Sequence, residues 1–261
     1  MPDAAGFAHH RPELAETLTR GDEKIAGIMG AADARTFPAG ETIIEGSSEH
    51  AFVYRLRQGW AGRVRGLPDG RNQFIMIFLP NDLFAVKSMF LAVHPDAVTA
   101  LSDVVVERIN HRELREACDA DRDVATRCTW QLIEEERRLH NWVTGLGAGS
   151  AEERMAHLLL DFHGRLVRSG QIAPEAGEYD LPMTQEQLGD HLGISTVHVN
   201  RVLKGLRENG IATMRARRVR IGDMPALARI AFPLQDPFMR ETPEFGGSGV
   251  SAEGGRGERP A

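Results

Sequence analysis

Between about Arg35 and Asn110 the hydrophobic positions gather in short β-rich runs: TFPAGETIIEG, AFVYRLRQGWAGRVRG, NQFIMIFLPNDLF and AVTALSDVVVERIN. Runs of this kind, bounded by turn residues, are typical of β-strands. The apolar runs are separated by Pro38-Ala39-Gly40, Pro68-Asp69-Gly70 and Pro80-Asn81-Asp82, and an Asp-Gly pair between two such runs is a hairpin signal. Several short strands with regular turns predict an all-β roll or barrel.

Between Asp121 and Leu146 the apolar residues follow the spacing of a helix. The apolar face, which Glu135 interrupts, carries Val124, Cys128, Leu132, Leu139 and Trp142 or Val143. A nearly heptad seam of this kind packs either onto its own domain or onto the same helix of a partner chain. The pattern alone leaves both possibilities open.

The segment MTQEQLGDHLGISTVHVNRVLKGLRENG predicts two helices joined by a tight turn. Thr184 and Gln187 form a capping box that starts the first helix, and Gly193 ends it because glycine adopts the left-handed conformation without steric cost. Ser195 can cap the second helix. A steep helix crossing requires a small residue at the contact, which Gly189 provides. We interpret the segment as a helix-turn-helix, with an ordinary α-helical hairpin as the alternative.

The outward face of the second helix and the two short strands after it are basic. From Thr196 to Arg220 seven basic residues stand against Glu208 alone, a local charge of +6 in a protein of net charge −6. Such an excess beside a helix-turn-helix is typical of a surface that contacts DNA phosphates. The residues expected to contact DNA are Ser195, Thr196, Val197, His198, Asn200, Arg201, Lys204, Arg215, Arg217 and Arg218.

Length and composition set the outer limits. The 261 residues are enough for two domains, and 42% hydrophobic with 26% charged residues is ordinary for a globular protein. No apolar run reaches about 18 residues and no secretory leader is visible, so we expect a cytoplasmic protein without membrane contact. Two cysteines, Cys118 and Cys128, fit a reducing compartment.

The motifs FPAGETIIEG, YRLRQGWAGRVRGLPDGR, FLPNDLF and MTQEQLGDHLGISTVHVNR, in this order, resemble the Crp/Fnr family of bacterial transcription regulators over about residues 20–232. The resemblance implies an α+β fold: an N-terminal double-stranded β-helix (jelly-roll) sensor domain, a long dimerisation helix and a C-terminal winged helix-turn-helix domain. The expected parts are an N-terminal extension (1–20), a cyclic-nucleotide-binding-like β-roll (21–120), the dimerisation helix (121–147), the DNA-binding domain (150–232) and a disordered tail (242–261).

The same resemblance implies a homodimer that binds a pseudo-palindromic site in double-stranded DNA and has RNA polymerase as a partner. Arg201 matches the arginine that commonly contacts bases in the family, whereas Val197 stands where the family often carries glutamate. With the long helix assigned to the dimer, the expected interface consists of Val124, Cys128, Leu132, Leu139 and Trp142.

The sensor half departs from the pattern of the cyclic-nucleotide binders in the family. Ala85-Val86 replaces their Gly-Glu pair, and no arginine occurs between Ser88 and Glu107. A cyclic phosphate would then lack its charge partner and its ribose acceptor, with Lys87 as the one substitute. We therefore predict no response to cyclic AMP, an unknown effector, and an effector pocket formed by Phe84, Val86, Lys87 and Ser88.

No cofactor is predicted. Two cysteines cannot supply the four that an iron–sulfur cluster requires, and the histidines lack a spacing that indicates a metal site or haem ligation. The alternatives to a regulator are a metal-dependent, cupin-like β-roll enzyme and a ligand-binding regulatory subunit. The enzyme would need a His-x-His pair that residues 35–110 lack, and the subunit would not explain the basic segment. We predict no catalytic residue.

Overall fold

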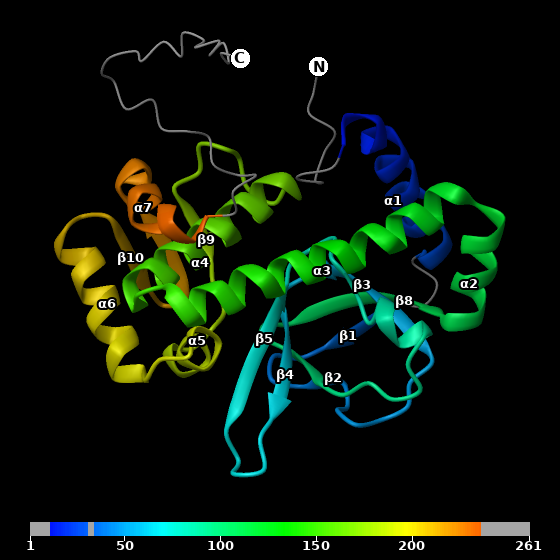
Figure 1. Cartoon of the computed structure of the whole chain (residues 1–261), viewed down its shortest axis with the longest axis horizontal. Coiled ribbons are helices and arrows are strands. Elements are labelled where there is room, and N and C mark those ends of the chain that lie inside the picture. The colour runs from blue at the N-terminus through cyan, green and yellow to red at the C-terminus, as the bar shows by residue number, and fades with distance from the viewer. Residues whose placement is uncertain (1–10, 31–33, 236–261) are drawn as a thin grey trace, which may run out of the picture.

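The computed structural model describes residues 11–30 and 34–235. A β-roll and a smaller helical domain lie at either end of one long helix, α3 (Arg122–Ala148), which runs across both (Figure 1). The predicted tail, 242–261, and the first ten residues of the predicted extension lie outside the described residues. Across the two described ranges, no helix has the length and apolar character needed to cross a bilayer.

Two antiparallel four-stranded sheets form the roll, as the strand pattern predicts. One sheet contains β1 (Arg35–Phe37), β8 (Val104–Asn110), β3 (Phe52–Gln58) and β6 (Leu83–Phe84), in this order. The other contains β2 (Thr42–Ile44), β7 (Ala97–Ala100), β4 (Ala61–Gly66) and β5 (Asn72–Phe78). Their facing side chains, including Leu56, Phe78, Val98 and Val106, are fully buried. The predicted hairpin at Asp69-Gly70 joins β4 to β5, with Gly70 at φ +85°.

The boundary predicted at residue 20 is wrong because it falls inside a helix, α1 (Ala15–Met29). Leu18, Ile25 and Met29 lie on its buried face. Gly21 lets α1 approach α3 closely, since a Cβ there would come within 2.4 Å of the carbonyl oxygen of Asp123. Residues 15–20 are therefore part of the packing of the sensor half.

The apolar face of α3 corrects the predicted dimer interface. Val124 and Cys128 are 1% and 5% exposed within a single chain, in a core shared with α1, β3 and α2 (His111–Ala120). Leu132 and Leu139 pack against the cores of the same chain, and the indole Nε1 of Trp142 donates to the carbonyl of His191. Val124 and Cys128 are therefore not available to a partner chain, whereas Leu132, Leu139 and Trp142 are half-buried. The periodicity of the sequence identified the buried face of α3, but not the elements against which that face packs.

The C-terminal domain consists of α4 (Ala151–Arg168), β9 (Glu178–Asp180), α5 (Gln185–Leu192), α6 (Thr196–Glu208), β10 (Ala212–Arg215), β11 (Arg218–Ile221) and α7 (Met224–Ala231). Its sheet has the order β10-β11-β9. One hydrophobic core joins this domain to the roll: Trp60 meets Phe162 edge to face at 5.0 Å between ring centroids.

Candidate nucleic-acid interface

The first helix of the predicted pair, α5, begins with the expected capping box. The Thr184 backbone N–H donates to Gln187 Oε1 at 2.8 Å, and the Gln187 N–H donates to Thr184 Oγ1 at 3.1 Å. Leu188 and Leu192 form its buried face. The reciprocal bonds satisfy two backbone donors that a helix start otherwise leaves free, which confirms where the pair begins.

The turn between α5 and α6 requires glycine at both positions 189 and 193. Gly193 ends α5 at φ +65° and ψ +38°, in the left-handed region. A Cβ on Gly189 would lie 2.6 Å from the carbonyl oxygen of Ile194. The small residue is therefore required by the backbone of the turn itself. The Ser195 side chain then caps α6 by accepting from the His198 N–H at 3.3 Å.

The two faces of α6 separate cleanly. Val199, Leu203 and Leu206 are buried in the core of the domain. The opposite face is exposed and carries the α6 residues predicted to contact DNA: Ser195, Thr196, Val197, His198, Asn200, Arg201 and Lys204. Val197 is 70% exposed, although it is apolar. Asn200 Nδ2 donates to the carbonyl of Thr196 at 3.0 Å, which fixes its side chain along the helix.

Arg217 lies at the tip of the β10–β11 hairpin, the predicted wing. Ala216 and Arg217 form its two-residue turn, with φ values of +49° and +60°. Positive φ at both positions is the geometry that matches the twist of a hairpin, but it favours Gly or Asn over residues with a larger side chain. The Leu181 N–H donates to the Arg217 carbonyl at 2.8 Å and holds the turn from the side.

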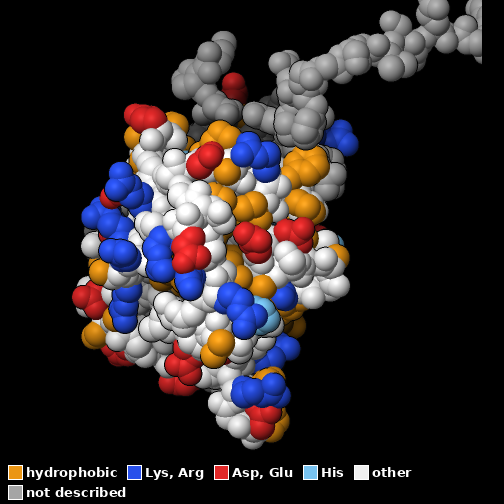
Figure 2. Space-filling model, turned by 90° about the vertical axis from the view of Figure 1, so that its left-hand side faces the viewer, with side chains coloured by type: hydrophobic (Ala, Val, Ile, Leu, Met, Phe, Trp, Pro, Cys, Tyr) orange, Lys and Arg blue, Asp and Glu red, His pale blue; other side chains and the backbone are white. Residues whose placement is uncertain are grey.

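The charge of the basic segment is lower in the fold than along the sequence. Strand β9 brings Glu178 to 3.3 Å from Arg220 and Asp180 to 3.6 Å from Arg218. With these two carboxylates and Glu208, the seven basic side chains leave a net charge of +4. Four arginines form no ion pair with any residue that the structure describes: Arg201, Arg207, Arg215 and Arg217. Figure 2 shows Lys and Arg side chains gathered along one margin of the face built from this domain.

The helix pair is fixed directly to the roll, which the sequence did not reveal. His191 Nδ1 bonds the carbonyl of Phe74 on β5 at 2.8 Å, and Gln73 Nε2 donates to the carbonyl of Asp190. Burial lowers the pKa of His191, which keeps its imidazole neutral. With the bond from Trp142, both α3 and β5 therefore hold α5 and orient the exposed face of α6. Bonds to backbone carbonyls leave no sequence signature.

The four residues predicted to form an effector pocket do not share one cavity. Phe84 packs inside the roll, whereas Val86 packs with α1 and α3 on the other side of the sheet. Ser88 is buried at the end of η3 (Val86–Met89), and Lys87 Nζ lies 4.0 Å from Asp96 Oδ2.

A buried ion pair occupies the space between β4 and α3. Arg63 Nη2 bonds Glu135 Oε2 at 2.8 Å, and the guanidinium lies over the Phe78 ring. Glu135, the interruption in the apolar seam of α3, is thus the counter-charge of a buried arginine.

Metal and redox groups are few in the described chain. No three His, Cys, Asp or Glu side chains of the residues described are arranged to hold a metal ion. Cys118 and Cys128 are free thiols, half-buried and buried respectively.

Comparison with known proteins gives two matching domain families. Residues 34–121 match the cyclic nucleotide-binding domain, and residues 153–230 match the Crp-like helix-turn-helix domain. The transcriptional activator protein FnrL of Cereibacter sphaeroides is 25% identical over 75% of this chain and 79% of its own. The structure of FixK2 from Bradyrhizobium japonicum is 28% identical, with a TM-score of 0.70 over 77% of this chain and 98% of that chain.

The chain is a member of the Crp/Fnr family of transcription regulators. A transcriptional regulator of the CRP family from Thermus thermophilus, TTHB099, is 26% identical with a TM-score of 0.63 over 76% of this chain and 96% of its own. As a Crp/Fnr protein with a complete helix-turn-helix, the chain is a DNA-binding transcription regulator. Neither the comparisons nor the site favours the cupin-like enzyme or the regulatory subunit.

Proposed function

We propose that this Crp/Fnr regulator binds a pseudo-palindromic operator as a homodimer, with α6 in the major groove and the β10–β11 hairpin beside it. The exposed face of α6 supports this proposal most strongly. Val197, which is apolar, and Arg201, which forms no ion pair with a described residue, both face outward. The residues on the opposite face are buried in the core. Exposed side chains such as these two do not contribute to the core of a single chain.

The side chains suggest how a half-site is read. Arg201 can present two parallel N–H groups to O6 and N7 of guanine. Thr196 and Val197 offer methyl groups that suit a thymine methyl. Because Val197 stands where the family often carries glutamate, we expect the recognised half-site to differ from the commonest one. Arg215 and Arg217 on the hairpin are suited to phosphates, which position the protein without specifying sequence.

A different face of α3 is suited to form the dimer. Thr129, Ile133, Glu136, His140 and Val143 are exposed and follow one another at steps of four and three residues, which is the repeat of a coiled-coil seam. Ile133 and Val143 are 44% and 58% exposed although they are apolar. This stripe lies on the opposite side of α3 from the face buried against the roll. In the proposed dimer, the two α6 helices would read half-sites about one helical turn of DNA apart.

Selection of bound duplexes from a random pool tests the operator. We expect enrichment of a two-fold symmetric motif with half-site centres about 10 bp apart. The selection is run with the purified protein, with and without cell extract, since an effector from the extract could be required. Failure to enrich any duplex at low ionic strength in both conditions would contradict the proposal.

Charge placed in the exposed stripe tests the dimer. The double variant Ile133→Asp, Val143→Asp should sediment as a folded monomer, because neither side chain supports the core of its own chain. Val93→Asp is the matched control, since Val93 is also 44% exposed but lies on the roll. A dimer that survives the double substitution would rule out this stripe as the interface.

We also propose RNA polymerase as a partner, a cytoplasmic location and no response to cyclic AMP. The buried pair of Arg63 and Glu135 supports the last point, because it fills the space between β4 and α3 with the chain's own charges. Calorimetric titration should show no binding of cyclic AMP to the roll. Micromolar binding that Lys87→Gln abolishes would contradict this prediction.

A further inference from the structure

A cavity of about 340 Å³ opens where the two domains meet. Its walls come from α1, the middle of α3, residues 79–82 between β5 and β6, and the C-terminal end of α4. This volume lies at the lower end of those that hold small-molecule ligands. We propose that the cavity binds a small phosphate ester, of the size of a mononucleotide.

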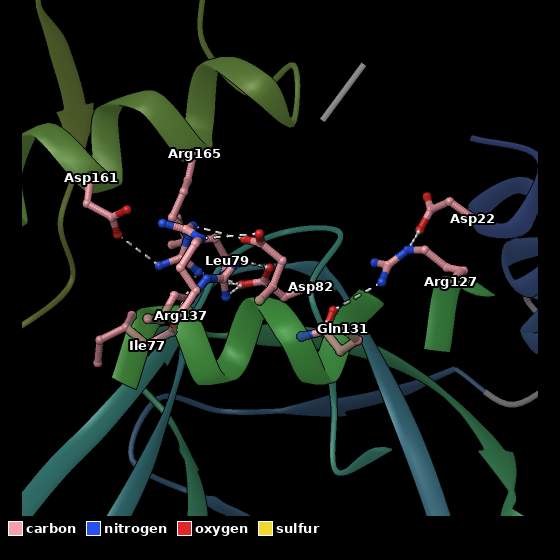
Figure 3. Close-up of polar contacts among 11 residues, drawn as sticks. Asp22, Ile77, Leu79, Asp82, Arg127, Gln131, Arg137, Asp161 and Arg165 are labelled. Carbon is pink, nitrogen blue, oxygen red and sulfur yellow. Dashed lines mark hydrogen bonds and ion pairs between the residues drawn. The ribbon is translucent and has the colours of Figure 1, made fainter. Parts of the chain in front are cut away.

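One wall is a fixed network of charges. Asp82 accepts from Arg165 Nη2 at 2.6 Å and from Arg138 Nη2 at 3.1 Å, and the Leu79 N–H donates to the same carboxylate at 2.8 Å (Figure 3). Burial alone would raise the pKa of Asp82, but the charges of Arg138 and Arg165 outweigh it and hold the pKa at about 2. The two guanidinium groups are therefore held in place, one on α3 and one on α4.

Two hydrogen-bond donors in the lining have no partner. Gln131 is 3% exposed, and its Oε1 accepts from Arg127 Nη1 at 3.2 Å. Because arginine can only donate, the amide oxygen must face Arg127, and Nε2 has no acceptor in the part of the chain that the structure describes. Arg138 Nε is likewise buried without an acceptor. A buried donor without a partner is costly unless something else satisfies it.

Three of the four carboxylates that line the cavity are already paired with arginines. Asp22 pairs with Arg55 and Arg127, Asp82 with the two arginines above, and Glu134 with Arg137. The other lining carboxylate, Glu23, is exposed at the edge of α1.

Arg168 is the cation left over, because it forms no ion pair with any described residue. Burial lowers its pKa, and the nearby charges of Arg165, Arg137 and Arg138 lower it as well, whereas the charge of Asp161 acts in the opposite direction. An anion in the cavity would add a counter-charge beside this guanidinium.

Phosphate fits this set of donors better than a carboxylate does. Arg168, Arg138 Nε and Gln131 Nε2 come from different positions, and a phosphate group offers three oxygens where a carboxylate offers two. Arginine is also the side chain best matched to phosphate geometry. Trp130, Leu79 and Pro80 complete the lining with apolar surface for the remainder of the ester. A ligand bound here would contact α3 and α4 together.

Calorimetric titration of the full-length protein with three probes tests the site. Adenosine monophosphate should bind, inorganic phosphate should bind more weakly, and adenosine should not bind. Arg168→Gln and Gln131→Leu should each weaken binding of the monophosphate by about tenfold or more, the effect of losing a charge-assisted or buried hydrogen bond. Lys87→Gln, in the roll, is the control and should leave binding unchanged.

Three results would overturn the proposal: no binding of the monophosphate or phosphate at low salt, unchanged affinity in both junction variants, or loss of binding in Lys87→Gln. Circular dichroism of each variant checks its fold. If one of the two junction variants does not fold, the other decides, because Gln131→Leu removes no charge and Arg168→Gln changes a side chain that is only half-buried.

Discussion

Two groups of arginines in this protein have opposite environments. Arg201 and Arg217 are exposed on α6 and on the tip of the β10–β11 hairpin and form no ion pair with the described residues. Arg138 and Arg165 are 16% and 7% exposed and share the carboxylate of Asp82. The side chain is the same in both groups, so the surroundings decide whether it serves binding or assembly.

The difference follows from the cost of removing a charge from water. A buried charge without its partner costs several kcal/mol, whereas exposed pairs contribute from nothing to about 1 kcal/mol. The buried group should therefore control the free energy of unfolding and the exposed group the affinity for DNA. Removing charges from each group separately tests this contrast.

The largest effect is expected from Asp82→Asn. It leaves two buried guanidinium groups without their shared counter-charge and should lower the free energy of unfolding by about 3–5 kcal/mol. Urea denaturation measures it. Asp69→Asn is the control, because Asp69 pairs with Arg71 on an exposed hairpin and should change stability by less than about 1 kcal/mol. Equal effects of the two substitutions would show that burial does not separate these pairs.

Acid should remove a similar stabilisation. The pKa of Asp82 is about 2 in the fold, against an ordinary value of 3.8, so its contribution is complete above pH 4 and is lost as the pH falls toward 2. At 1.36 kcal/mol per pKa unit, the loss is roughly 2 kcal/mol. Unfolding at pH 6, 4 and 2.5 should show a smaller pH dependence in Asp82→Asn than in the wild type. An identical dependence in both proteins would contradict the depressed pKa.

Arg201→Ala should act on binding and not on the fold. We expect it to weaken binding to the selected operator by about 1–3 kcal/mol and to relax the base preference at one position of each half-site. Fluorescence anisotropy with the operator and with single-base variants measures both. Arg112→Ala removes an exposed charge from α2 and controls for net charge. If both substitutions had the same effect, α6 would not be reading bases.

The smallest effect is expected from Arg217→Ala. A phosphate contact carries no sequence information, so affinity should fall modestly and equally for operator and random DNA. The slope of log affinity against log salt concentration should decrease by about 1. A loss confined to the operator would instead place Arg217 in a groove.

Local signals predicted the helix-turn-helix well. The capping box at Thr184, the left-handed Gly193 and the cap at Ser195 each depend on a few neighbouring residues, so the sequence contains the whole reason for them. The strands of the roll were predicted on the same grounds, since β-rich runs and the turn residues between them are local signals.

Long-range contacts account for what the sequence could not predict. The face of α3 with Val124 and Cys128 was recognised as apolar, but its neighbours come from α1 and β3, far away in the chain. Strand β9 has three residues and gains its partner only through β11. The junction at Asp82 brings together residues 56 and 83 positions apart, and no spacing rule connects them.

The turn at Ala216 and Arg217 places an arginine at the tip of the β10–β11 hairpin at the expense of backbone strain. Two residues with a Cβ occupy left-handed positions there, at a strain of about 1 kcal/mol or more that an Asn-Gly turn would avoid. Arg217→Gly would relieve that strain, but it would also remove the guanidinium from the tip of the hairpin. A relaxed turn and an arginine side chain at the tip therefore exclude each other at this position, and the sequence has the arginine.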